Sequence, residues 1–216
     1  MAMRSLLIVG DSNQKFIHEN VLYSELSVDK VVTGSVDPKN RGYCSERSWI
    51  NAKFAEKNLE EQVPKLLEQT NFNLLVIQSP TNDISNLKGE KHAKLLAKKS
   101  STTTLRIAKE SLDSFKSLEK VIVMPRPPRC DTEQLQTLND YSNSCLYSQS
   151  LDKRITIGTM EAFENKKVED IFGEKRNKPD YIHLKGKLGA VAYNMAIIQS
   201  VHKALASDIE NFVTSL

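Results

Sequence analysis

Short apolar runs recur along the chain, and polar residues follow each of them. The runs are rich in Val, Ile and Leu and do not alternate with polar residues, which is typical of strands buried on both faces, as in a parallel sheet covered by helices. They comprise residues 6–9, 31–32, 74–77, 121–124 and 155–157. We therefore predict about five parallel strands in one sheet.

Between these runs, apolar residues recur at intervals of three to four, which is the spacing of an amphipathic helix. The predicted helices cover residues 13–26, 59–67, 101–118, 132–151 and 186–205. This alternation predicts a three-layer α/β domain, in which ligands bind outside the carboxyl ends of the strands. The longest irregular stretches, 34–48 and 160–179, are expected to be surface excursions that shape a site.

Composition indicates a globular chain that forms a single domain over residues 1–216, which is long enough to bury a substantial core. Its 30 basic and 27 acidic residues give a net charge of +3, too balanced to predict a nucleic-acid or membrane partner by itself. Met1-Ala2-Met3 is open to two interpretations, a remnant of cloning before a native start or the beginning of an excised domain.

The cysteines and the apolar segments indicate a cytoplasmic protein. Cys44, Cys130 and Cys145 are widely spaced and form no C-x-x-C pair, so neither a zinc site nor a disulfide framework is predicted. No apolar stretch approaches the roughly 20 residues that span a bilayer. Residues 6–9 are too short for the apolar region of a secretion signal. We expect free thiols in a reducing compartment.

Gly10-Asp11-Ser12 directly follows the first predicted strand. Taken alone, it favours an ordinary turn, because Gly, Asp and Ser are common turn and helix-cap residues. The alternative is that Ser12 is a nucleophile at a helix N-terminus, where backbone N–H groups stabilise an oxyanion. A third interpretation, a phosphate cradle of a nucleotide-binding protein, lacks a Walker sequence and a G-x-G-x-x-G motif.

Two further polar clusters are predicted at the same edge of the sheet. Asn82 follows the third run, and its amide can donate to a developing oxyanion, although its neighbours would also make an ordinary turn. Asp180 and His183 precede the last helix, and a carboxylate three residues from an imidazole can accept its Nδ1–H. Nε2 is then left to take a proton from a serine. The alternative is a loop histidine with an incidental aspartate.

The order of these clusters resembles the SGNH (GDSL-type) hydrolase superfamily over residues 6 to about 205. Gly10-Asp11-Ser12 matches its first block, Thr81-Asn82-Asp83 its third, and Asp180-x-x-His183 its last. The resemblance implies a flavodoxin-like α/β/α fold and a serine esterase or deacetylase that acts on small acyl esters. It implies no metal and no cofactor.

The resemblance also implies a role for each site residue. Ser12 would be the nucleophile, His183 the general base and acid, and Asp180 the residue that orients the imidazole. The oxyanion hole would combine the N–H of Ser12, the Asn82 amide and the N–H of a second-block glycine. For that glycine Gly34 is the best candidate, and Gly42 is the second.

Two residues depart from the superfamily pattern. Pro80 stands where the third block normally has glycine, and Asn13 follows the serine where leucine is usual. Proline fixes φ and removes a donor, which changes the setting of the Asn82 loop. The alternative function is therefore a catalytically degenerate SGNH-like module that binds RNA or a protein partner. The basic stretch 91–99 would contact phosphate in that case, whereas a solvated helix face is its ordinary interpretation.

Residues 121–131, with the sequence Pro-Arg-Pro-Pro-Arg, and residues 77–87 carry a second resemblance. They are similar to divergent intracellular SGNH-like domains of animals, including those in the first proteins of some non-LTR retrotransposons. This resemblance implies a nucleic-acid-associated chain. Arg126 and Arg129 lie just beyond the fourth predicted strand, where they would bind an anionic group of the substrate or form a stiff loop.

Overall fold

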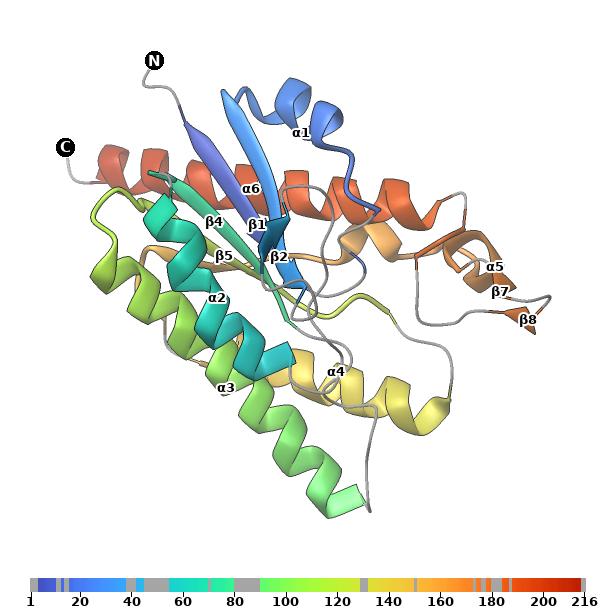
Figure 1. Cartoon of the computed structure of the whole chain (residues 1–216). Coiled ribbons are helices and arrows are strands. Elements are labelled where there is room, and N and C mark those ends of the chain that lie inside the picture. The colour runs from blue at the N-terminus through green and yellow to red at the C-terminus, as the bar shows by residue number, and fades with distance from the viewer. Residues whose placement is uncertain are drawn as a thin grey trace.

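The computed structural model has a central six-stranded sheet with helices on both faces (Figure 1). It describes residues 4–10, 13, 16–37, 42–44, 55–69, 71–79, 90–128, 132–149, 151–172, 174–175, 178–179, 184–186 and 188–214.

The sheet contains the predicted parallel strands in the order β2-β1-β4-β5-β6. Their bounds are β1 Ser5–Val9, β2 Lys30–Asp37, β4 Leu74–Gln78, β5 Lys120–Met124 and β6 Ile155–Ile157. This is a doubly wound order, in which the chain changes direction between β1 and β4. The predicted fold class is therefore confirmed, and the carboxyl ends of β1 and β4 are the expected place for a ligand.

The expectation that residues 34–48 and 160–179 are irregular is wrong in part. β2 continues to Asp37, and β3 (Gly42–Cys44) pairs with it in the antiparallel sense at the edge of the sheet. The second stretch contains the 3-10 helix η3 (Glu161–Phe163), helix α5 (Val168–Ile171) and a hairpin of β7 (Glu174–Lys175) and β8 (Lys178–Pro179). Elements this short carry too little periodicity to be recognised in a sequence.

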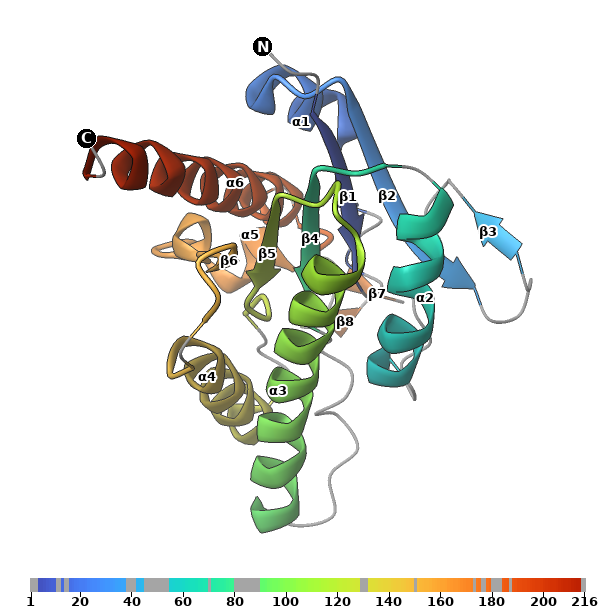
Figure 2. The same cartoon turned by 90° about the vertical axis from the view of Figure 1, so that its left-hand side faces the viewer.

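Helices cover both faces of the sheet, which lies between them in Figure 2. α1 (Glu19–Leu26) and α6 (Gly189–Thr214) pack on one face, and α2 (Ala55–Gln69) and α3 (Glu90–Ser114) pack on the other. α4 (Glu133–Tyr147) lies against α3. The strands alternate their side chains between these layers, so that Leu6 and Ile8 face α1 and α6 while Leu7 faces α2 and α3. Both faces of the sheet are covered by helices and buried, which explains why polar residues do not alternate with apolar ones in these strands.

Helix α3 begins at Glu90, well before the predicted start at residue 101. It runs through Ser100-Ser101-Thr102-Thr103-Thr104, a stretch of poor helix formers. Hydroxyls of this stretch donate back to carbonyls one turn earlier at 2.9–3.1 Å, as those of Ser101, Thr102 and Thr104 do. The basic stretch and the helix predicted after it are therefore one continuous helix.

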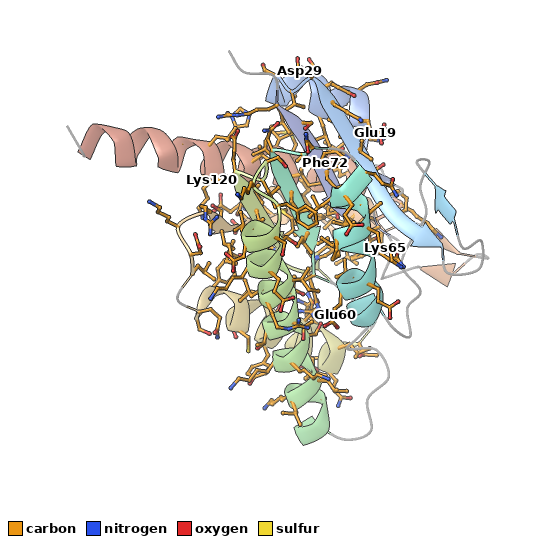
Figure 3. All side chains as sticks on the ribbon, turned by 60° about the vertical axis from the view of Figure 1, so that its left-hand side comes forward. Glu19, Asp29, Glu60, Lys65, Phe72 and Lys120 are labelled. Atoms are coloured by element: carbon orange, nitrogen blue, oxygen red, sulfur yellow. The ribbon has the colours of Figure 1, made fainter. Side chains whose placement is uncertain are left out.

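The amino-terminal edge of the sheet is held by a side-chain network of its own. Asn73, one residue before β4, accepts from the Ser5 backbone N–H through Oδ1 at 3.1 Å. The Lys30 ammonium lies 5.9 Å from the centre of the Phe72 ring, and Figure 3 labels Asp29, Phe72 and Lys120 along this edge. Farther down the same view, Glu60 of α2 faces α3, where Arg106 pairs with it at 2.7 Å.

No helix in the described part of the chain combines the length and the apolar composition needed to cross a bilayer.

Candidate active site

Most residues predicted to form the site lie outside the described residues: Ser12, Asn82, Arg129, Asp180 and His183. The chain on either side of them is described, however. Gly10 and Asn13 flank the serine after β1, Ser79 follows β4, and Leu184 comes directly after the histidine. Gly10, Asn13, Ser79 and Leu184 are all buried, so each of the three segments that carry the predicted site has at least one end inside the protein.

Gly34 and Gly42 differ in their distance from β1. Gly34 lies within β2, where its register partner is Val9, the last residue of β1. Gly42 lies in β3 and pairs with Asp37, so that β2 separates it from β1. This register favours Gly34 as the glycine next to the predicted serine.

The segments that follow Ser12 and precede α6 are joined by a hydrogen bond. The backbone N–H of Leu184 donates to Oδ1 of Asn13 at 3.3 Å, across 171 positions of sequence. Both residues are 0% exposed. Because Asn13 and Leu184 are the immediate neighbours of Ser12 and His183 in the sequence, this contact joins the two segments that adjoin the predicted nucleophile and base.

Asn194 of α6 fixes the rest of the segment after the serine. Its Oδ1 accepts from the His18 N–H at 2.8 Å, and its Nδ2 donates to the Phe16 carbonyl at 2.8 Å. These backbone groups are therefore not used for helix hydrogen bonds, and α1 begins at Glu19 instead of the predicted residue 13. Asn194 is 3% exposed, so this contact is part of the interior.

The segment that follows the histidine is anchored on α5. The N–H of Gly186 donates to the Ile171 carbonyl at 3.0 Å, and that of Leu188 donates to the Asp170 carbonyl at 2.8 Å. A β-carbon at Gly186 would lie 2.3 Å from the Asp170 carbonyl oxygen, and one at Gly189 would lie 2.1 Å from that of Ile171. Only glycine permits this close approach of the two backbones.

The carboxyl end of β4 is attached to α6 as well. The Tyr193 hydroxyl donates to Oε1 of Gln78, and both side chains are 0% exposed. The next residue, Ser79, donates its N–H to the Met124 carbonyl of β5 at 3.1 Å. Two neighbouring elements therefore fix the point from which the chain leaves toward Asn82.

Arg126 does not project from the sheet edge toward solvent, as a ligand of an anionic substrate would. It is 1% exposed, and its guanidinium donates to the hydroxyls of Ser142 and Ser100, at 2.8 Å in the case of Ser100. Asn143 of α4 binds its backbone on both sides, accepting from its N–H at 2.8 Å and donating to its carbonyl at 3.0 Å. These contacts favour a structural role, in which Arg126 ties β5 to α3 and α4.

A hollow of about 460 Å³ lies beyond the carboxyl ends of β5 and β6. Residues of α4, η3 and the adjoining loops line it: Pro128, Tyr147, Thr159, Met160, Glu161, Phe163 and Glu164. Partial burial raises the pKa of the Tyr147 hydroxyl, and the Glu161 carboxylate raises it further. Within the described residues, no group of three or more His, Cys, Asp or Glu side chains could hold a metal ion.

Sequence reasoning missed the polar residues that hold the site segments together. Tyr193 follows the apolar spacing of the last predicted helix, and nothing in the sequence distinguishes Asn194 from an ordinary polar residue of that helix. Asn13 did carry a signal, because it replaces the usual leucine. A polar residue at a position expected to be apolar and buried predicts a specific hydrogen-bond partner.

No protein-family model matches the sequence, and no curated protein matches it significantly. Solved structures do match, over nearly the whole chain. A catalytic mutant of an acetylxylan esterase from Geobacillus stearothermophilus has a TM-score of 0.61 at 10% identity, covering 93% of this chain and 95% of that one. A lipase from a goat rumen metagenome has a TM-score of 0.59 at 12% identity, covering 92% and 98%.

A member of the lipolytic G-D-S-L family from Veillonella parvula has a TM-score of 0.57 at 13% identity, covering 91% of this chain and 97% of that one. Structural matches at identities this low show a shared fold and do not establish a shared activity. The resemblance predicted from Gly10-Asp11-Ser12 and the later blocks is therefore confirmed at the level of architecture. The chain has the α/β/α fold of the SGNH (GDSL-type) esterases and lipases.

Proposed function

We propose that this protein is a serine esterase or deacetylase with Ser12, His183 and Asp180 as its catalytic triad. The observation that carries the proposal is the 3.3 Å hydrogen bond from the Leu184 N–H to Asn13 Oδ1. It joins the residues next to the predicted nucleophile and base, which the sequence separates by most of its length. Joined segments of this kind are what a serine–histidine pair requires, because the two side chains must come within hydrogen-bond reach.

The proposed reaction has two halves. Ser12 Oγ attacks the ester carbonyl while His183 Nε2 takes its proton and then gives it to the leaving alcohol, which leaves an acyl-enzyme. Water, deprotonated by His183, attacks this intermediate and releases the acid and the free serine. Asp180 holds the imidazole throughout. The N–H groups of Ser12 and Gly34 and the Asn82 amide hold the negative oxygen in both halves.

Hydrolysis of p-nitrophenyl acetate tests the proposal, since a small acyl group is the substrate that we propose. Ser12→Ala is expected to lower kcat/KM by at least about 1000-fold, the range seen when a triad member is removed. Ser24→Ala is the control, because Ser24 is an exposed serine of α1. It is expected to keep full activity.

Labelling with a fluorophosphonate, followed by peptide mapping, gives the second test. The probe is expected to modify Ser12 and to spare Ser24, because only an activated hydroxyl attacks the phosphorus atom. Equal turnover by wild type and Ser12→Ala, or labelling that does not depend on Ser12, would overturn the proposal.

The second candidate function is an RNA-binding module without esterase activity, and one observation favours it. The first turns of α3 extend beyond the ends of α2 and α4 in Figure 2, and Lys98 and Lys99 are exposed on this helix. Lysines on a protruding helix are placed to contact phosphates.

Binding of a single-stranded RNA oligomer at low salt distinguishes the two functions. Under the second candidate function, Lys98→Glu together with Lys99→Glu abolishes binding, whereas Ser12→Ala leaves it unchanged. Lys109→Glu is the control, because Lys109 is an exposed lysine near the other end of the same helix. Absence of RNA binding at low salt would contradict this candidate.

A further inference from the structure

We propose that Asn13 is a positioning residue, whose side chain sets the position of the segment around Leu184, and through it of His183, relative to the segment that carries Ser12. The inference rests on the proposed function, since it assigns a role within the same site. It concerns a residue that neither attacks the substrate nor transfers a proton. Asn13 acts on Ser12, which precedes it in the chain, and on His183, which precedes its hydrogen-bond partner Leu184.

The contact is one that the fold cannot replace with water. Asn13 and Leu184 are both 0% exposed, so the Leu184 N–H has no access to solvent. A buried backbone donor needs an acceptor, and Asn13 Oδ1 is the acceptor it has, at 3.3 Å. An aliphatic side chain of similar volume at residue 13 would leave this N–H unsatisfied. The segment would then have to move until the donor met another acceptor.

The two segments are otherwise anchored to different parts of the protein. The segment before α6 is attached to α5 through Gly186 and Leu188. The segment after the serine is attached to Asn194, which binds the backbone of Phe16 and His18. Among the described residues, Asn13 makes the direct hydrogen bond between these segments. This hydrogen bond therefore fixes the distance between the segment after the serine and the segment before α6.

A fixed distance matters here because proton transfer between serine and histidine depends steeply on geometry. Misplacement by about 1 Å costs on the order of 100-fold in rate. Substrate binding depends less on this one distance. Loss of the Asn13 contact should therefore lower kcat and leave KM nearly unchanged, and that split distinguishes positioning from a general loss of structure.

Asn13→Leu and Asn13→Asp form the decisive pair of variants. Leucine keeps the volume and removes the acceptor, so kcat for p-nitrophenyl acetate should fall by about 100-fold while KM stays within about threefold. Aspartate keeps an oxygen that accepts from the Leu184 N–H in either protonation state, so kcat should recover to within about tenfold of wild type. The rate of fluorophosphonate labelling should follow kcat, because it reports the same proton transfer.

Asn73→Leu is the matched control at the opposite edge of the sheet. Asn73 also uses Oδ1 to accept a distant backbone N–H, that of Ser5 at 3.1 Å. Its loss should lower the Tm and leave kcat unchanged. If Asn73→Leu lowers kcat as much as Asn13→Leu, the effect is one of stability and the inference is wrong.

The remaining outcomes are distinguishable. An active wild type with an equally active Asn13→Leu overturns the inference and leaves the proposed function standing. A wild type that neither turns over ester nor reacts with fluorophosphonate overturns both. If Asn13→Leu does not fold, amide hydrogen exchange of wild type decides: the Leu184 N–H should exchange at least about 100-fold more slowly than an unprotected amide, and fast exchange contradicts the contact.

Discussion

Gly186 and Gly189 lie so close to α5 that neither leaves space for a β-carbon. The atoms in the way are carbonyl oxygens of Asp170 and Ile171, which cannot rotate aside as a side chain would. Gly158 is different, because the atoms closest to its missing β-carbon belong to the side chains of Met124 and Ser200. Side chains can change rotamer, and so they can accommodate an added atom at lower cost.

Gly189→Ala is therefore expected to destabilise the protein by about 2–4 kcal/mol. Gly158→Ala should cost less, about 1–2 kcal/mol, because its obstacles are side chains. Urea unfolding followed by circular dichroism measures both. Gly189→Ala should also lower esterase activity at temperatures where it is fully folded, because the segment before α6 must shift away from α5. Equal stability of the two variants would contradict the argument from backbone contact.

Arg126 shows what could be predicted from sequence at the scale of a single residue. The pattern placed Arg126 correctly just beyond β5. Its burial could not be predicted, because the sequence Pro-Arg-Pro-Pro-Arg is typical of a polar loop. Ser100 and Ser142, whose hydroxyls accept hydrogen bonds from its guanidinium, lie on two separate helices. Contacts of that range follow from the packing of α3 on α4 and not from any local spacing.

At the scale of elements, the central strands were predictable and the helix ends were not. β1, β4 and β5 are runs of apolar residues buried on both faces, so their own composition identifies them. The ends of α1 and α3 depend on side chains instead. Asn194 binds the backbone before α1, and serine and threonine hydroxyls let α3 continue through a stretch of poor helix formers.

The turn before β6 carries an ion pair with a defined pH dependence. Arg154 donates to Asp152 with its side chain at 2.8 and 3.1 Å and with its backbone N–H at 2.9 Å. These hydrogen bonds from Arg154 lower the pKa of the Asp152 carboxyl to about 2. A pKa lowered by folding means that the stabilisation is complete above the ordinary aspartate pKa and is lost as the pH falls toward 2.

Asp152→Asn should therefore be less stable than wild type by about 1 kcal/mol at pH 7, the upper range for solvent-accessible pairs. The difference should shrink as the pH falls below about 4 and be mostly lost at pH 2, where half of the folded molecules are protonated at Asp152, and it should vanish below that pH. Thermal unfolding of both proteins across this range measures it. Asp113→Asn is the control, since Asp113 lies farther from Arg154, at 3.5 Å. A difference between Asp152→Asn and wild type that is as large at pH 2 as at pH 7 would contradict the assignment.

For the whole molecule, the order of strands and helices was sufficient to predict the fold, and the edge at which the site forms stays a prediction that follows from that fold. A doubly wound sheet brings the carboxyl ends of β1 and β4 side by side, whatever residues follow them. What the sequence could not provide is how the final helix takes part. α6 contacts two parts of the chain next to the predicted site. Of its consecutive residues, Tyr193 binds Gln78 of β4 and Asn194 binds the segment before α1. Neighbouring residues of a helix diverge by about 100°, and this lets one turn bind two elements.

Tyr193→Phe tests whether this attachment of α6 extends to the site. The variant removes one hydroxyl that donates to Gln78, and both side chains are fully buried. We expect a loss of stability of about 1–2 kcal/mol, because the Gln78 oxygen loses a donor that water cannot replace. We also expect kcat for p-nitrophenyl acetate to fall by about tenfold, since Gln78 leads directly into the segment that carries Asn82.

Tyr147→Phe provides the matched control for this prediction. The Tyr147 hydroxyl also donates to an oxygen of a β-strand connection, the Gly158 carbonyl, at 3.2 Å. Tyr147 is 55% exposed, however, so water can replace the lost donor and the cost should be about 0.5 kcal/mol or less. Its kcat should equal that of wild type. If both variants lose stability and activity to the same extent, burial at the junction of α6 and β4 has no special part in the site, and the attachment is ordinary packing.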